Sequence, residues 1–340
     1  MNKWNSITAT VAALSILLGT APVVMAQQPA AATTTASNAQ TSVNLDPTAT
    51  KRLTDVLNTL AGKQTIEFTS ADTASDAWTV YGTLKGTANA DFIQNYDSKK
   101  GIVQSTSIIY KAADMDKVMP PNLRSKVASF LKTFDTDKVF KIEAIWRVYS
   151  PIDEGGFKNY WVLWGKNQSI YIHLDQGNKI TASFLYPLKD VKAALINKAN
   201  RSLKTLGIPT MKPFEYTLRQ REDNDTIWHF RDESDTNSVQ IGVKTGKVWA
   251  VKNEHGMDWD GDKDFAKAFA KPKLSKNQAL SAAKSKVQSL FGINLKGYTV
   301  QIKKNEYTFL KKGAATVVGK INKKNVFYSL EAIPANGIRN

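Results

Sequence analysis

The chain has 340 residues, and its 46 Lys and Arg outnumber its 30 Asp and Glu, so its formal net charge is +16 at pH 7. It contains no cysteine, which excludes disulfides, thiol catalysis and zinc sites built from Cys. The length is sufficient for an ordinary hydrophobic core, which an exported protein without disulfides requires.

The N-terminus has the pattern of a secretory signal peptide over residues 1–26. Lys3 is followed by an apolar run over 7–18 and by the small-residue cleavage pattern Val24-Met25-Ala26. The run is shorter than the ~20 residues that a membrane span needs, and no later segment approaches that length. We therefore expect a secreted or envelope-associated protein of a Gram-positive bacterium, with no membrane span in the mature chain. Residues 27–43 are mainly Ala, Thr, Ser and Gln, which predicts a disordered linker.

Four segments then begin with an amphipathic helix. In the first, Asp46 is the expected N-cap, Pro47 occupies the first helical position, and Gly62 ends the helix. In the last, Ser275 and Gln278 have the spacing of a capping box, and Gly292 ends that helix. The two helices between them end at Asp135 and Gly207. The intervals between these four end points are 73, 72 and 85 residues, which indicates an internal repeat.

Alternating strands follow each helix, and each set closes with a pair of strands around a tight polar turn. These turns lie at 97–101, 175–179, 244–247 and 322–325, and their Asp, Asn, Gly and Lys residues are typical of β-hairpins. The sequence therefore predicts an α+β fold of about four tandem units, each with one helix packed on a small antiparallel β-sheet. The predicted divisions are signal peptide 1–26, disordered linker 27–43, units 44–117, 118–187 and 188–254, acidic linker 255–273, and a basic fourth unit 274–340.

The fourth helix, "LSKNQALSAAKSKVQSLFG", and the turn-and-strand segment "VKTGKVWAV" carry a family resemblance. Together they resemble the PepSY-type module and the YcdB/YcdC-like repeats of secreted Bacillus-group proteins. The match is best at 244–249 and weakest at 322–326, where Asn325 replaces the turn glycine. The resemblance implies a noncatalytic exported module, in some cases linked to regulation or inhibition of secreted peptidases, and it supplies no catalytic residues.

The positive charge is concentrated at the C-terminal end. Residues 265–340 contain fifteen Lys and Arg but only Glu306 and Glu331, so they carry +13 of the formal +16. Positive charge concentrated in one segment creates a positive electrostatic field there, which favours anionic partners such as wall polymers, anionic lipid or extracellular DNA. The candidate polymer-binding residues, chosen because they lie in or beside the expected turns and strands, are Lys303, Lys304, Lys311, Lys312, Lys323 and Lys324.

A weak Ca²⁺ candidate lies just before this segment, and it is the only cofactor that the sequence suggests. Asp258, Asp260, Asp262 and Asp264 occupy alternate positions, and oxygen ligands at such positions can surround a hard cation. The register of a calcium-binding loop fails, because placing Gly261 sixth puts Gly256 first and Lys267 twelfth. The alternative is an acidic linker that contacts the basic fourth unit.

Catalytic patterns are sparse. The three histidines, His173, His229 and His255, form no metal-binding pair, and the first two are interpreted as strand residues with a satisfied hydrogen bond. Paired carboxylates for glycoside hydrolysis are represented only by Asp153-Glu154 and Glu222-Asp223, both in expected turns.

Two tryptophans lie three positions apart in one expected strand, at Trp161 and Trp164. In a regular strand such residues point to opposite faces, so at least one of them could be exposed. An exposed indole could stack on a sugar ring or contact a partner, whereas a buried one would anchor a helix to the sheet.

The expected function is therefore that of a secreted, noncatalytic PepSY-like protein whose basic C-terminal unit associates with an anionic cell-envelope polymer or an acidic protein. One alternative is an inhibitor or chaperone-like regulator of a secreted peptidase, acting through a sheet edge. Another is an envelope polysaccharide hydrolase. The sequence contains no dedicated nucleic-acid motif and does not specify an oligomeric state.

Overall fold

The computed structural model describes residues 43, 45–135, 138–152, 157–209, 214–222 and 225–340. The predicted signal peptide and all but Val43 of the predicted linker lie outside these residues. Asp153, Glu154 and Asp223, the candidate hydrolase carboxylates, lie outside them as well.

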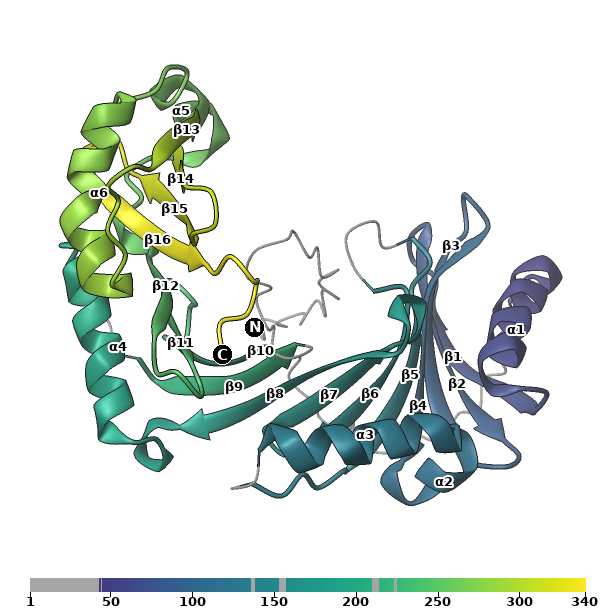
Figure 1. The fold of residues 1–340 in the computed structure, drawn as a ribbon. Coiled ribbons are helices and arrows are strands. Elements are labelled where there is room, and N and C mark those ends of the chain that lie inside the picture. Colours follow the sequence, from purple (N-terminus) through teal and green to yellow (C-terminus); the bar gives the residue numbers. More distant parts are fainter. Residues whose placement is uncertain (1–42, 44, 136–137, 153–156, 210–213, 223–224) are drawn as a thin grey trace, which may run out of the picture. The chain divides into compact units, whose positions relative to one another are not determined.

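The described chain forms six α-helices and sixteen strands (Figure 1). The helices are α1 Pro47–Ala61, α2 Met115–Val118, α3 Pro121–Phe134, α4 Ala193–Thr205, α5 Gly261–Ala268 and α6 Lys276–Phe291. The strands before α4 are β1 Thr65–Asp72, β2 Ala77–Lys85, β3 Ala90–Asp97, β4 Ile102–Lys111, β5 Ala144–Tyr149, β6 Asn159–Gly165, β7 Gln168–His173 and β8 Lys179–Pro187. The later strands are β9 Tyr216–Glu222, β10 Asp225–Arg231, β11 Asn237–Gly242, β12 Val248–Asn253, β13 Thr299–Lys303, β14 Glu306–Leu310, β15 Thr316–Ile321 and β16 Phe327–Ile333. Four single 3-10 turns are η1 Ala112–Asp114, η2 Leu174–Gln176, η3 Leu188–Asp190 and η4 Glu254–Gly256.

The predicted architecture of tandem units with separate small sheets is wrong. The strands form one 16-stranded sheet in the order β1 to β12 followed by β16, β15, β14 and β13, and every pairing whose register is known is antiparallel. The expected sheets would end at β4, β8 and β12, but β4 pairs with β5, β8 with β9, and β12 with β16. Each such pairing satisfies the backbone N–H and C=O groups that an isolated small sheet would leave unpaired at its edges.

The chain divides into two compact units. Unit 1 contains the residues up to Lys132, Lys138–Lys166 and Tyr171–Lys179, and unit 2 contains Thr133–Asp137, Asn167–Ile170 and Ile180–Asn340. The finer unit boundaries expected from the repeat stay a prediction.

In unit 1, α1 packs on the sheet through a small apolar core. Ala49 and Leu53 of α1 are fully buried against Val80 of β2, Tyr96 of β3 and Val103 of β4. The helix begins and ends where the sequence predicted. The carboxylate of Asp46 accepts hydrogen bonds from the N–H groups of Thr48 and Ala49, and Gly62 follows the last turn with a φ of 74°.

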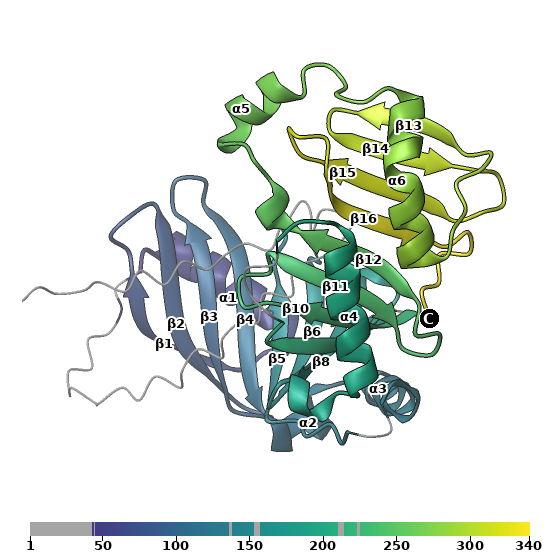
Figure 2. The ribbon, with the colours of Figure 1, turned by 90° about the vertical axis from the view of Figure 1, so that its left-hand side faces the viewer.

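In unit 2, α4 lies over β9–β12 and α6 lies over β13–β16 (Figure 2). Ala279, Ala283 and Val287 form the buried face of α6. The predicted capping box at Ser275 and Gln278 is confirmed, and Gly292 follows the helix in the left-handed region. Gly319 of β15 is needed for close packing, because a Cβ there would lie 2.5 Å from the ring of Phe327.

Within unit 2, the residue that follows α3 forms a buried ion pair with a residue of β9. Asp135, which the sequence marked as the residue after the helix, accepts hydrogen bonds from Tyr186 and, at 3.1 Å, from Arg219. The Arg219 guanidinium also lies 5.5 Å from the ring centroid of Trp228. Burial, together with the hydrogen bond to the Asp135 carboxylate, raises the pKa of the Tyr186 hydroxyl, which therefore stays protonated as the donor.

Candidate functional site

The six candidate lysines lie at two opposite ends of the β13–β16 strands. Lys303 is the last residue of β13, Lys304 lies in the β13–β14 turn, and Lys323 and Lys324 belong to the β15–β16 turn. These two turns are adjacent, because Asn305 donates from Nδ2 to the Ile321 carbonyl at 3.0 Å. We call these four lysines the paired-turn cluster.

Lys311 and Lys312 lie in the β14–β15 turn at the other end. They are separated from the paired-turn cluster by the length of β14, which is about 14 Å at the rise of an antiparallel strand. Lys296, in the loop before β13, joins this end, because its carbonyl accepts a hydrogen bond from Lys311 Nζ at 3.2 Å. We call Lys296, Lys311 and Lys312 the distal cluster. The sequence analysis did not select Lys296, which lies fifteen positions away and is brought close only by the β13–β14 hairpin.

Acidic residues partly neutralise the paired-turn cluster. The N–H of Lys323 donates to Asp258 Oδ1 at 2.7 Å, and its Nζ donates to Asp264 Oδ2 at 3.0 Å. The hydrogen bond to Asp264 raises the pKa of Lys323, and the same bond lowers the pKa of Asp264. Lys304 Nζ lies 5.6 Å from the ring centroid of Phe265. The expectation that the acidic linker contacts the basic segment is therefore confirmed at Lys323.

The distal cluster has a different environment. Lys311 Nζ lies 5.8 Å from the ring centroid of Tyr298, and Lys296 and Lys312 are exposed. The two carboxylates of residues 265–340 are engaged elsewhere, since Glu306 pairs with Lys320 at 3.8 Å and Glu331 with Arg339 at 2.6 Å. The distal cluster therefore presents positive charge that neither of these carboxylates offsets.

The four aspartates of the Ca²⁺ candidate lie in different local environments. Asp258 and Asp264 contact Lys323, Asp260 is the N-cap residue of α5, and Asp262 lies exposed in the first turn of that helix. Within the residues that the structure describes, no group of three or more His, Cys, Asp or Glu side chains is arranged to hold a metal ion. Calcium binding stays a prediction.

His229 of β10 is buried on the face of the sheet opposite α4. Its Nδ1 lies 3.1 Å from Gln220 Oε1, as expected of a hydrogen-bonded strand histidine, but its Nε2 has no hydrogen-bond partner in the described part of the chain. Burial, together with the charges of Arg231, Lys252 and Arg339, lowers the pKa of His229 to about 3. The imidazole is therefore neutral at physiological pH.

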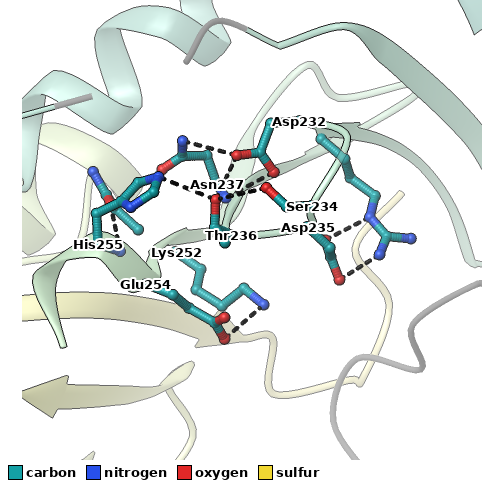
Figure 3. A network of polar contacts seen from close by, with 10 residues as sticks. Asp232, Ser234, Asp235, Thr236, Asn237, Lys252, Glu254 and His255 are labelled. Atoms are coloured by element: carbon teal, nitrogen blue, oxygen red, sulfur yellow. Dashed lines mark hydrogen bonds and ion pairs between the residues drawn. The ribbon is translucent and has the colours of Figure 1, made fainter. Parts of the chain in front are cut away.

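A network of polar contacts surrounds the turn between β10 and β11 and the end of β12 (Figure 3). Asp232 accepts hydrogen bonds from the N–H of Asn237 at 3.2 Å and from the hydroxyl of Thr236 at 2.5 Å. Thr236 Oγ1 also lies 3.2 Å from Nε2 of His255. In an acid–base relay the histidine lies between the nucleophile and the acid, whereas here the hydroxyl lies between Asp232 and His255. The network therefore shapes the turn and does not form a catalytic triad.

No family model, no curated protein and no solved structure matches this chain. In the part of the chain that the structure describes, no helix is both long and apolar enough to cross a membrane.

Proposed function

We propose that this protein is an exported, noncatalytic binding protein that associates with an anionic cell-envelope polymer through the basic end of unit 2. The N-terminal signal pattern supports export, and the resemblance to PepSY-type modules supports a noncatalytic role. An acidic protein is the alternative partner for the same lysines. The observation that carries the proposal is the position of the two lysine clusters at opposite ends of one four-stranded segment.

The spacing of the clusters favours a polymer over a small anion. A single phosphate or carboxylate cannot contact lysines about 14 Å apart, whereas a chain with repeating anionic groups can reach both ends. Each exposed lysine contact is weak and screened by salt, so affinity comes from the sum of several contacts. The distal cluster should contribute more than the paired-turn cluster, because Asp258 and Asp264 already contact Lys323.

Retention on isolated Gram-positive cell walls during a salt gradient tests the proposal. We expect the wild-type chain to bind at low salt, and we expect Lys311→Glu/Lys312→Glu to elute at clearly lower salt. The matched control is Lys51→Glu/Lys63→Glu, which makes the same change in net charge at exposed positions of unit 1. If both double variants shift equally, only net charge matters and the assigned surface is wrong. Failure of the wild-type chain to bind at low salt contradicts the proposal as a whole.

The same gradient on an immobilised acidic protein separates the two kinds of partner.

A peptidase regulator acting through a sheet edge would use β1 or β13, the two outer strands in the sheet order. β13 has five residues and ends at Lys303, which is followed by Lys304, and β1 carries a bulge between Phe68 and Ser70. Short length, lysines and bulges discourage strand addition, so the lysine surface is the better-supported site.

A further inference from the structure

Aromatic side chains from β5, β6 and the unit 1 part of β7 form a continuous row on one face of the sheet. The ring centroids of Trp146 and Trp164 are 6.0 Å apart, and those of Trp164 and Tyr171 are 6.4 Å apart. Tyr160 extends the row, with its ring centroid 6.2 Å from that of Tyr171 and 6.0 Å from that of His173. Trp146, Trp164, Tyr160 and Tyr171 are each half-buried, so each ring retains some exposed surface. We call these four residues the aromatic row.

The aromatic row lies on the face of the sheet opposite α1. Directly paired residues share a face, and Trp146 pairs with Val162 while Arg147 pairs with Trp161. Trp161 is 5% exposed and lies on the other face, where the Arg147 guanidinium is 5.3 Å from its ring centroid. The prediction that Trp161 and Trp164 point to opposite faces is confirmed.

Neutral polar groups continue the same face beyond the aromatic row. Ser107 of β4 pairs with Val148, two residues along from Trp146. Next to it, Asn95 of β3 donates from Nδ2 to Ser105 Oγ at 2.8 Å and accepts from Thr79 Oγ1 at 3.2 Å. The face therefore combines stacked rings with hydroxyl and amide groups.

Two further features define which ligand would fit. The positions of β5–β7 on this face include no Asp, Glu, Lys or Arg: they are Ala144, Trp146, Val148, Tyr160, Val162, Trp164, Ser169, Tyr171 and His173. The indole Nε1 of Trp164 is buried and has no hydrogen-bond acceptor in the described part of the chain. An atom this buried is out of reach of a ligand on the surface, so a ligand would contact the exposed part of the Trp164 ring and not its N–H.

We propose that the aromatic row binds a neutral saccharide chain. The C–H faces of sugar rings stack on aromatic rings, and sugar hydroxyls can exchange hydrogen bonds with Ser107 and its neighbours. Single-stranded nucleic acid also stacks on aromatic rings, but its binding grooves are lined by cations, which these strand positions do not provide. This site is separate from the lysine clusters and uses a different chemistry.

The test measures binding of the full mature chain to soluble neutral polysaccharides. Migration in native gels containing glycol chitin, hydroxyethyl cellulose, laminarin or galactomannan identifies a ligand. Saturation-transfer NMR with the corresponding oligosaccharide then tests wild-type protein without any substitution. We expect retardation by at least one polysaccharide. A neutral ligand has no charges for salt to screen, so the retardation should be the same at about 0.1 M and at about 1 M salt. Binding to cell walls through lysines would instead weaken with salt, so the two proposals fail independently.

Substitutions locate the site. Trp164→Ala and Trp146→Ala should each weaken binding about tenfold, which corresponds to about 1.4 kcal/mol. Trp164→Phe keeps a smaller ring for stacking, so it should lose only part of the affinity. Its matched control is Trp249→Phe, which removes another buried and unpartnered indole N–H in unit 2. Trp249→Ala, which removes a half-buried indole from unit 2, is the control for the alanine variants.

Several results would overturn the proposal. One is the absence of both retardation and saturation transfer for all four saccharides with wild-type protein. Another is binding that the controls weaken as much as the Trp164 and Trp146 variants do. If oligo(dT) or a proline-rich peptide binds the row and the saccharides do not, the ligand class is wrong. If an alanine variant fails to fold, Trp164→Phe and the wild-type NMR measurement decide the outcome.

Discussion

At the scale of single residues, His229 shows how the surroundings of a side chain determine its charge. Its side chain is almost fully buried, and the positive charges of Arg231, Lys252 and Arg339 act on it. Both effects oppose protonation, so the folded chain holds a neutral imidazole where the unfolded chain would hold a cation at acid pH.

This difference predicts a pH-dependent stability. The pKa of His229 is about 3 in the folded state and ordinarily 6.5, so the unfolded state takes up the proton first as the pH falls. The stabilisation is complete above pH 6.5 and is lost progressively as the pH falls toward 3. Relative to His229→Gln, the wild-type chain should lose up to about 1.4 kcal/mol per pH unit in this window.

Urea unfolding at pH values from 7.5 to 4.5 measures this effect. His255→Gln is the control, because it makes the same substitution at an exposed histidine. Parallel curves for wild type and His229→Gln across the whole range would contradict the prediction.

At the scale of elements, α6 depends on its capping box. Ser275 Oγ accepts from the Gln278 N–H at 3.3 Å, and Gln278 Oε1 accepts from the Ser275 N–H at 2.9 Å. Both bonds satisfy donors that a helix start otherwise leaves unpaired.

Ser275→Ala should therefore destabilise the protein by about 1 kcal/mol. Thermal unfolding followed by circular dichroism measures the loss. Ser281→Ala is the control, because this serine is exposed inside α6, where alanine has the higher helix propensity. An equal loss in both variants would show that the cap is not the cause.

At the scale of the whole molecule, the order of the last strands gives the C-terminal segment a structural task. β16, and not β13, pairs with β12, through Ala250, Val251 and Lys252. The tail after β16 returns to the same region, where Arg339 donates to Gln240 at 2.6 Å and to Glu331 at 2.6 Å. The segment with most of the positive charge thus also covers an edge of the remaining sheet.

Deleting residues 265–340 should therefore cause association and not only loss of polymer binding. Removal of β16 leaves the N–H and C=O groups of β12 unpaired, and exposed edges of this kind promote pairing between chains. Size-exclusion chromatography should show larger species for the truncated chain than for the full chain. Lys311→Glu/Lys312→Glu, which keeps β16, should elute like the wild type. A truncated chain that elutes as a single small species would contradict this expectation.

Local interactions made several elements predictable. The ends of α1 and α6 follow from Asp46, Gly62, Ser275 and Gly292, because capping involves residues only a few positions apart. The opposite faces of Trp161 and Trp164 follow from the two-residue period of a strand. These features can be predicted without knowing how the rest of the chain folds.

Long-range pairing was not predictable in the same way. Alternation of polar and apolar residues shows which face of a strand is buried, but it does not show which strand lies beside it. The pairing of β4 with β5, of β8 with β9 and of β12 with β16 therefore contradicted the expected separate sheets. The contact of Lys323 with Asp264, and that of Lys311 with Lys296, likewise depend on hairpins and loops that bring distant residues together.

The sequence by itself determined the basic character of residues 265–340, the ends of the main helices and the positions of the hairpin turns. These properties depend on composition and on interactions between near neighbours in the chain. Only the tertiary structure decided that the sheets join into one, that the candidate lysines separate into two clusters, and that aromatic residues from β5, β6 and β7 form one row. Each of these depends on pairing between strands, whose hydrogen bonds are made by backbone groups common to all residues and therefore leave little trace in the sequence.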